Sequence, residues 1–352
     1  MGDNSKIEWT DATWNPIVGC SIVSPGCTNC YAMKMADRLE AMTPKPNGEG
    51  NAHLLHYRGT TTRGEFMNKP PVWTGKVALA PDHILTQPLR WRRPRRIFVN
   101  SMGDLFHESV PDEWIDRVFA VMALCPQHTF QVLTKRSARM RAYIGGLVCG
   151  TGYRPYVRRP GWTAKDPRDG DAVLLLDADQ AWPLPNVLIG VSVEDQRRAD
   201  ERREDLAALA TSGWQTFVSY EPALGHVDWT GWEFLSWLIS GGESGPRARP
   251  SHPDWHRAAR DFCAAHGIPY LFKQWGEWAV AIDRERDDPD WRADYSRKFA
   301  DDVKTRWLNL DGGRGFHGEK FHVMRRVGKR AAGRLLDGVE HNGMPTTIAR
   351  VA

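Results

Sequence analysis

Three cysteines stand close together near the start of the chain. Cys20, Cys27 and Cys30 lie in the segment GCSIVSPGCTNCYA with the spacing C-x6-C-x2-C. This spacing lets three thiolates converge on one small inorganic centre. Three thiolates are enough to hold a four-iron cluster and leave one iron open to a substrate or cofactor, whereas a structural zinc ion normally takes a fourth ligand. The loop is therefore predicted to form part of an active site.

Other uses of these thiols stay open from the residues alone. Zinc can recruit a histidine such as His53 or His107 as a fourth ligand, and Cys27 and Cys30 alone can form a redox pair. The chain opens on the polar segment MGDNSKIEWTDATWNP rather than on an apolar signal segment, so secretion and a disulfide framework are not expected. Cys263 falls on the apolar stripe of a predicted helix and is expected to be a core residue, as is Cys125.

The elements that position the cysteines alternate between short apolar runs and helical patterns. The apolar runs are mostly unalternated, as parallel strands covered on both faces require. They are residues 15–19, 96–101, 128–134, 186–192, 216–220, 235–240 and 268–272. Helical patterns begin at 111–112 and span 195–210 and 253–266. Six or seven β-α units result, which predicts an α/β fold with a partial parallel β/α barrel of the TIM-like type.

Two irregular stretches interrupt this series. Residues 1–278 are expected to form the barrel, with insertions at about 43–95 and 145–185, and residues 279–352 a basic C-terminal extension packed on or near it. Long irregular segments in compact domains are often lids or binding loops, although plain surface loops are the alternative. With 41% hydrophobic and 26% charged residues and no apolar run long enough to cross a bilayer, we expect a cytoplasmic protein without a membrane partner.

Polar residues follow the predicted strands. The carboxyl ends of parallel strands in a barrel meet at one mouth, where the chemistry of this architecture takes place. We therefore expect these side chains to face the cysteine loop, although some of them can simply cap or decorate helices. They include Ser101, Asp104, Lys135, Arg136, Glu194, Asp195, Ser219, Glu221, Glu243 and Lys273.

Several phrases of the sequence carry a resemblance. The cysteine loop followed by a parallel β-α series resembles the radical S-adenosylmethionine (radical SAM) superfamily, whose common spacing is C-x3-C-x2-C, with three residues fewer in the first gap. More specifically, about residues 7–278 and most of the tail resemble a phage and prophage family of unknown function, the three-cysteine-motif radical SAM-like proteins. The matching phrases are WNPIVGCSIVSPGCTNCYA, FVNSMGDLFH, FQVLTKR, GVSVEDQ, FVSYEPALG, ISGGESGPRARP and YLFKQWG.

The resemblance implies a [4Fe-4S] cluster on the three cysteines, with S-adenosyl-L-methionine chelating the fourth iron through its amine and carboxylate. Cleavage of this cofactor would give a 5′-deoxyadenosyl radical that abstracts a substrate hydrogen, and an electron donor such as flavodoxin or ferredoxin would be needed. We expect the cofactor to contact Tyr31, Ser101, Asp104, Lys135, Arg136, Glu194 and Ser219, although Tyr31 can instead be a core residue. The candidates for a further catalytic group are Glu221, Glu243 and Lys273.

Clustered basic residues indicate which class of substrate the protein binds. The formal charge is only +4, but arginines beside tryptophan can track a phosphate backbone and stack on bases, although such loops often only solvate a fold. The candidates are Arg90, Trp91, Arg92, Arg93, Arg95, Arg158, Arg159, Lys329 and Arg330. Phage enzymes of the resembled superfamily include ones proposed to rearrange hypermodified thymidines in DNA. We therefore expect a radical isomerisation or related reaction on a modified DNA base in the cytoplasm of a phage host. Radical modification of a peptide or small molecule and a non-catalytic iron-sulfur or zinc protein are the alternatives.

Overall fold

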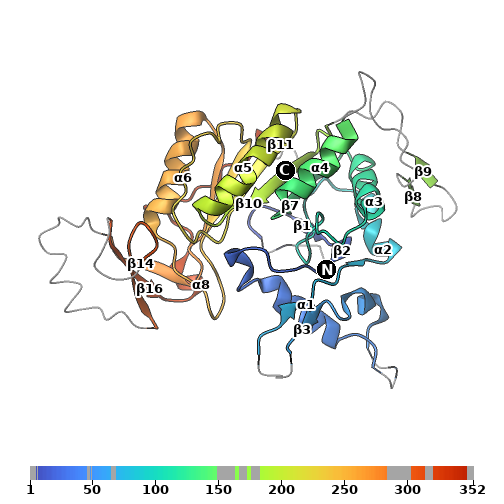
Figure 1. Cartoon of the computed structure of the whole chain (residues 1–352), viewed down its shortest axis with the longest axis horizontal. Helices are drawn as coiled ribbons and strands as arrows, with labels where there is room; N and C mark the ends of the chain where they lie inside the picture. Colours follow the sequence, from blue (N-terminus) through green and yellow to red (C-terminus); the bar gives the residue numbers. More distant parts are fainter. Residues whose placement is uncertain are drawn as a thin grey trace, which may run out of the picture. The chain divides into compact units, whose positions relative to one another are not determined.

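The chain builds a seven-stranded parallel sheet, several of whose strands are labelled in Figure 1. The structure is a computed structural model, and it describes residues 5, 7–45, 48, 50–64, 69–148, 163–165, 173–175, 183–283, 303–313 and 320–346. The strand order is β1-β6-β7-β10-β11-β12-β13, and the pairs β1–β6, β6–β7, β7–β10, β11–β12 and β12–β13 are parallel. Their bounds are β1 Ala12–Trp14, β6 Arg96–Val99, β7 Thr129–Thr134, β10 Val187–Ser192, β11 Gln215–Tyr220, β12 Trp237–Gly241 and β13 Tyr270–Gln274. The predicted fold class, a partial parallel β/α barrel, is confirmed.

Helices follow the strands as the sequence patterns predict. In α3 (Asp112–Ala123) the side chains of Ile115, Val118, Phe119 and Met122 are fully buried, because their spacing places them on one face. Helix α6 begins at Pro253 and ends before Gly267, a left-handed residue of the kind that commonly terminates helices. The other long helices are α1 Tyr31–Ala41, α4 Ser137–Val148 and α5 Gln196–Thr211. Among the described residues, no helix has the length and apolar character needed to cross a membrane.

The strands are buried because both faces of the sheet are covered. All six residues of β10 are buried, and so are five of the six in β7. Trp14 from β1 is fully buried, with its ring centroid 5.8 Å from that of Phe130 in β7. Continuous apolar strands are the sequence signature of this arrangement, which is why their positions could be predicted.

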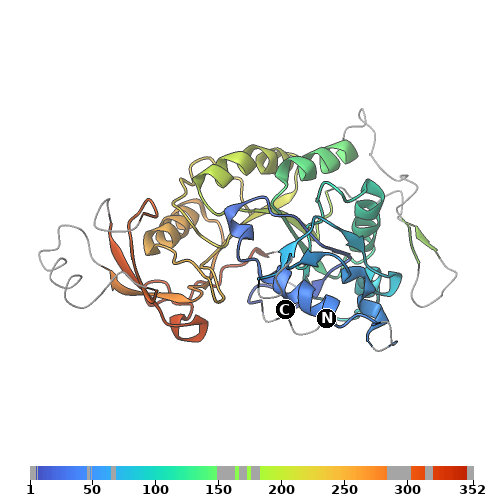
Figure 2. The same cartoon turned by 60° about the horizontal axis from the view of Figure 1, so that its bottom comes forward.

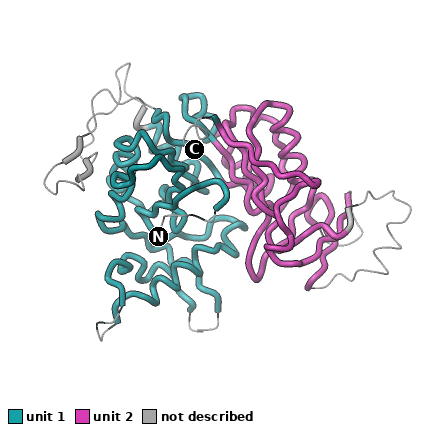
Figure 3. Tube along the Cα trace, turned by 180° about the vertical axis from the view of Figure 1, so that it is seen from behind, with its two compact units in different colours: residues 1–191, 205–216, 346–352 teal, residues 192–204, 217–345 magenta. Residues whose placement is uncertain are grey.

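The chain divides into two compact units (Figure 3). The first comprises residues 1–191, 205–216 and 346–352, and the second residues 192–204 and 217–345. The first unit holds the cysteine segment with β1, β6 and β7, which belong to the blue to green part of the chain in Figure 2. The second holds β12, β13, α6 and the antiparallel sheet β14-β16-β15, formed by β14 Trp278–Asp283, β15 Thr305–Leu308 and β16 His322–Arg326.

The C-terminal residues of the second unit contact the last strand of the large sheet. The amide of Phe272 in β13 donates to the carbonyl of His341 at 3.0 Å, and the amide of Gly343 donates to the carbonyl of Tyr270 at 2.8 Å. The short helix α8 (Lys329–Ala332) precedes this segment. The predicted boundary between barrel and extension at residue 278 coincides with the first residue of β14, and the domain division itself stays a prediction.

The predicted first strand, residues 15–19, is wrong in its position. The sheet strand β1 ends at Trp14, and Pro16, which lacks a backbone N–H, separates it from β2 (Ile17–Val18). Strand β2 pairs antiparallel with β5 (Ala78–Leu79), which belongs to the first predicted insertion. The cysteine segment is therefore held by that insertion as well as by the large sheet.

The structure describes most of the first predicted insertion but only short parts of the second. The first contains η2 Ala52–Tyr57, β3 Thr61–Thr62, β4 Val72–Trp73, α2 Asp82–Leu85 and η3 Gln87–Arg90, and β3 pairs antiparallel with β4. Most of the second lies outside the described residues, apart from the end of α4 and the antiparallel pair β8 Thr163–Lys165 and β9 Val173–Leu175.

Candidate functional site

Gly19 sets the course of the chain into the first cysteine. Its φ is +92°, and a Cβ at this position would lie 2.0 Å from the carbonyl oxygen of Lys76, so a side chain cannot be accommodated. Gly19 forms a parallel bridge with Gly103, and its amide donates to the carbonyl of Met102 at 3.1 Å. Cys20 is thereby placed beside the loop that follows β6.

The other two cysteines lie in a tight turn and at a helix start. Cys27 ends the 3-10 turn η1 (Pro25–Cys27), where its amide donates to the carbonyl of Ser24 at 3.0 Å. Cys30 donates its amide to the carbonyl of Cys27 at 3.2 Å and is the N-cap of α1. All three cysteines are free thiols. One short loop thus presents three unbridged sulfurs.

The distance that three sulfurs must span differs between a single ion and a cluster. Among the described residues, one group of three His, Cys, Asp or Glu ligand atoms lies mutually within 4.8 Å, and it contains none of these cysteines. The cysteine sulfurs are therefore not gathered as closely as the ligand atoms of that group. Two thiolates on a tetrahedral zinc ion lie about 3.8 Å apart, given Zn–S bonds of about 2.3 Å. A four-iron cluster, with each thiolate on a different iron, separates its sulfurs further.

The histidines predicted as alternative zinc ligands have other neighbours. His107 places Nε2 3.0 Å from the hydroxyl oxygen of Ser21, and the ring of His53 packs edge-on against that of His83 at 5.0 Å. Neither histidine joins the three cysteines in a compact group of potential ligands in the described part of the chain, and the choice between zinc and an iron-sulfur cluster stays a prediction.

A buried ion pair lies next to Cys20. Asp104 and Arg136 are joined at 2.9 Å (Oδ2 to Nη1), and their side chains are 8% and 4% exposed. The Asp104 carboxylate also accepts hydrogen bonds from the hydroxyl of Thr134 at 2.6 Å and the amide of Lys135 at 3.2 Å. Asp104 therefore ties the loop after β6 to the end of β7.

Arg136 extends this network to the cysteine loop. Its Nε donates to both carboxylate oxygens of Glu108 at 2.9 Å, and its Nη2 donates to the hydroxyl of Ser21 at 2.7 Å. Its Nη1 lies 3.6 Å from the sulfur of Cys20. Because the guanidinium group is rigid and planar, Arg136 can hold the loop after β6 and the cysteine loop in a fixed arrangement.

Lys135 and Arg136, which follow β7, influence the pKa values of the cysteine thiols. Burial raises the pKa of the Cys20 thiol to about 12, a rise that Asp104 increases and Arg136 opposes. Burial likewise raises the pKa of Cys30, which Lys135 and the nearby first amides of α1 oppose. Because metals bind the thiolate, the positive charges of Lys135 and Arg136 favour the form that a metal needs.

Two further predicted residues border the cysteine loop. The hydroxyl of Tyr31 donates to the carbonyl of Ser101 at 3.0 Å, and the hydroxyl of Ser101 donates to Oδ1 of Asn15 at 3.1 Å. Tyr31 is 56% exposed, so it is not the core residue that the sequence allowed. Asn15, which sequence reasoning did not select, follows β1 directly, and this position was its only signal.

The first unit thus brings the predicted residues around the cysteines together. They are Cys20, Cys27, Cys30, Tyr31, Ser101, Asp104, Lys135 and Arg136. They follow β1, β6 and β7, three adjacent parallel strands whose carboxyl ends share one edge of the sheet. Their individual roles toward a cofactor stay predictions.

The remaining mouth candidates lie in the second unit, and the three glutamates among them are each paired with a cation, whereas Asp195 accepts from the backbone amide of Arg198 at 2.9 Å. Ser219 is buried, and its carbonyl accepts from the amide of Val193 at 2.9 Å. The roles of these second-unit candidates toward a cofactor or in catalysis also stay predictions. The ion pairs are Glu194 with Arg202 at 2.9 Å, Glu221 with Lys273 at 2.9 Å and Glu243 with Arg249 at 2.6 Å.

The basic candidates have different environments. Trp91 is buried, and the guanidinium of Arg95 lies 4.7 Å from its ring centroid, so Trp91 anchors this segment and is not accessible to bases. Arg90 donates to the carbonyl of His83, and Arg92 and Arg93 are exposed. In the second unit, Lys329 and Arg330 are exposed on α8. Arg158 and Arg159 lie outside the described residues.

Fold and site together define an α/β protein with a partial parallel barrel and a three-cysteine loop at the carboxyl ends of its first strands. The chain belongs to the family described as "Protein of unknown function (DUF5131)", whose model matches residues 4–345. None of the curated proteins matches it.

Solved structures of spore photoproduct lyase are similar to this chain. A mutant with bound AdoMet and dinucleoside spore photoproduct has 11% identity and a TM-score of 0.39, over 92% of this chain and 71% of that one. Another mutant has 12% identity and a TM-score of 0.38, over 100% of this chain and 75% of that one. Similarity at this level assigns no activity to the chain.

Proposed function

We propose that this protein is a radical SAM enzyme in which Cys20, Cys27 and Cys30 hold a [4Fe-4S] cluster that binds S-adenosyl-L-methionine. The observation that carries the proposal is the loop of three free cysteines beside the buried Asp104–Arg136 pair. The adjacent Lys135 and Arg136 support it, because both favour thiolates. When bound, the cluster and its cofactor supply the chemistry of hydrogen-atom abstraction from a substrate.

The residues of this chain would bind and orient the cofactor. Tyr31 is adjacent to Cys30, largely exposed and fixed by the Ser101 carbonyl, so its ring offers a flat surface to an adenine.

The apolar side chains of Ile22 and Val23 in the cysteine loop are 49% and 39% exposed. They provide an apolar contact surface beside the cluster for the substrate or for an electron donor such as flavodoxin or ferredoxin.

Cofactor cleavage tests the enzymatic part of the proposal. After anaerobic reconstitution with iron and sulfide, addition of dithionite and S-adenosyl-L-methionine is expected to give 5′-deoxyadenosine and methionine, measured by chromatography and mass spectrometry. A fully loaded cluster that leaves the cofactor intact would instead identify a non-catalytic iron-sulfur protein. A protein that takes up zinc on the three cysteines, and no iron, would contradict the cluster itself.

We further propose a nucleic acid substrate, specifically a modified DNA base such as a hypermodified thymidine that is rearranged or isomerised. Two observations on the first unit support it. Arg92 and Arg93 are exposed side by side, and a cavity of about 350 Å³ is lined by Arg90, His53 and Asn15 among others. Asn15 also binds Ser101, which connects this cavity to the residues bordering the cysteine loop.

The salt dependence of DNA binding tests the role of these arginines. Each lost phosphate contact reduces the slope of log K against log salt by about 0.9 for duplex DNA. The variant Arg92→Gln/Arg93→Gln is therefore expected to bind DNA more weakly and with a slope smaller by about 1 to 2, measured by fluorescence anisotropy at several salt concentrations. Arg197→Gln, which removes an exposed charge from α5 in an ion pair with Glu201, is the control and should leave the slope unchanged. An unchanged slope in the double variant would mean that Arg92 and Arg93 do not contact phosphates, and absence of DNA binding by the parent would favour a peptide or small-molecule substrate.

A further inference from the structure

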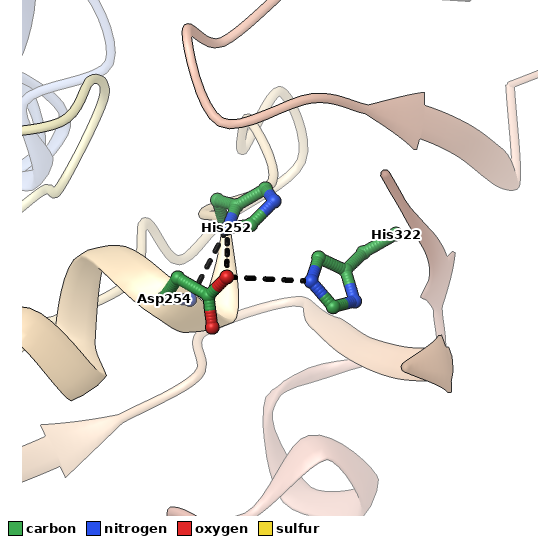
Figure 4. Close-up of side chains that lie close together, drawn as sticks. All are labelled: His252, Asp254 and His322. Carbon is green, nitrogen blue, oxygen red and sulfur yellow. Dashed lines mark hydrogen bonds and ion pairs between the residues drawn. The ribbon is translucent and has the colours of Figure 1, made fainter. Parts of the chain in front are cut away.

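A second group of potential metal ligands lies in the second unit. His252, Asp254 and His322 place one ligand atom each within 4.8 Å of one another, and no other such triplet occurs in the described part of the chain. His252 is the N-cap of α6, Asp254 lies in its first turn, and His322 begins β16. Figure 4 shows both imidazoles close to the Asp254 carboxylate. The histidines are 0% and 2% exposed, so the group is built into the interior.

The distances within this group suit ligands around one ion better than hydrogen bonds. Oδ2 of Asp254 lies 3.7 Å from Nε2 of His322 and 4.0 Å from Nδ1 of His252. Both separations exceed those of N–H···O hydrogen bonds. Oδ2 is buried and accepts no hydrogen bond among the described residues. Ligand atoms bound at about 2.0 Å to a tetrahedral ion are about 3.3 Å apart, so a small inward movement is enough.

The tautomer of His252 is fixed in a metal-binding form. Its Nε2 is hydrogen-bonded to the backbone carbonyl of Lys320, which can only accept, so Nε2 carries the proton. The lone pair of Nδ1 is therefore directed to the Asp254 side of the ring, where it accepts from the Asp254 amide at 3.1 Å. A histidine ligand commonly donates its second N–H to a backbone carbonyl in this way. An ion would replace the amide as the partner of Nδ1.

The charges around Asp254 leave one oxygen for a cation. Arg257 occupies Oδ1 at 2.9 Å, whereas the ammonium of Lys320 lies 3.7 Å from Oδ2. The Lys320 side chain is 46% exposed and can turn toward solvent. The ion pair with Arg257 favours the ionised carboxylate, which is the form that a metal ligand needs.

We infer that His252, Asp254 and His322 bind one Zn²⁺ ion, with water in the fourth position, and that the ion clamps β16 to the start of α6. Two imidazoles and one carboxylate are a donor set typical of zinc, and the Irving–Williams order places zinc above iron(II) for such ligands. This site is independent of the cysteine loop and of the reaction proposed there.

The test measures zinc and cobalt binding to the full chain with Cys20, Cys27 and Cys30 replaced by alanine, which removes the competing thiols. We expect one retained zinc ion per chain by elemental analysis, and with Co²⁺ the visible absorption of a tetrahedral site without sulfur ligands. His322→Gln should weaken zinc binding at least about 100-fold in a chelator competition. His341→Gln, in the same unit but outside the group, is the control and should bind as the parent does.

Two further measurements keep the test decisive if His322→Gln folds poorly. Lys320→Ala removes the competing ammonium and should tighten zinc binding, and zinc should raise the Tm of this variant and of the parent. Asp254→Asn should abolish that rise in Tm. Absence of any retained ion and of any Tm shift in the parent, or equal zinc binding by His322→Gln, would overturn the inference.

Discussion

Replacing Cys27 by alanine will leave a folded protein that cannot hold iron. Cys27 is 7% exposed, and its sulfur lies 3.7 Å from the hydroxyl of Ser24, so its removal leaves only a small gap in the loop. The cost to the free energy of unfolding should be about 1 kcal/mol, as for many single substitutions. The proposed cluster, by contrast, would lose one of three thiolates, and this loop contains no other cysteine to replace it. Bound iron and sulfide after reconstitution should therefore fall to a tenth or less of the parent value, as an order of magnitude.

The matched control for this variant is Cys125→Ala. Cys125 is fully buried after α3 and is likewise a free thiol, so the substitution removes the same atom from a site without metal ligands. Its iron content should equal that of the parent. Equal loading of the two variants would mean that Cys27 is not a ligand. Loss of iron from both would point to a general effect of removing a buried thiol.

The sheet was predictable because its signal is local. Buried parallel strands appear in the sequence as short apolar runs, and six of the seven runs coincide with sheet strands within about two residues. The first run failed because β1 has only three residues, Ala12–Trp14, and the more apolar Ile17–Val18 beyond Pro16 pairs with a strand far along the chain. Such an antiparallel pairing with residues 78–79 leaves no local pattern in either segment.

The sequence could select residues that the structure places near the cysteines, but not the contacts between them, and their roles stay predictions. Position after a strand was enough to select Asp104 and Arg136, because parallel strands bring their ends to one edge. Nothing in the sequence indicated that the two form a buried pair, or that Glu108 and Ser21 complete the network. His252, Asp254 and His322 escaped notice for a similar reason, since the third residue comes from a strand of the C-terminal sheet.

Arg136→Met should have the largest effect on stability of any change near the cysteine loop. The substitution leaves the Asp104 carboxylate buried without its cation, and breaking a buried ion pair from one side costs about 3 to 5 kcal/mol. Urea unfolding at neutral pH measures this loss. Arg139→Met is the matched control, because Arg139 pairs with Asp112 at a half-exposed site where an ion pair is worth about 1 kcal/mol or less.

A second measurement separates the effect on the cysteines from the effect on folding. Arg136 opposes the rise in the pKa of Cys20, so its removal should raise that pKa further and reduce the thiolate fraction at any given pH. Because iron must displace the thiol proton, cluster assembly in the folded variant should require a higher pH than in the parent. Asp104→Asn in the same chain removes the unpaired carboxylate, so it should recover part of the stability and return the assembly pH toward that of the parent. If Arg136→Met were as mild as Arg139→Met and assembled its cluster at the parent pH, Arg136 would neither fix the two loops nor assist the thiolates.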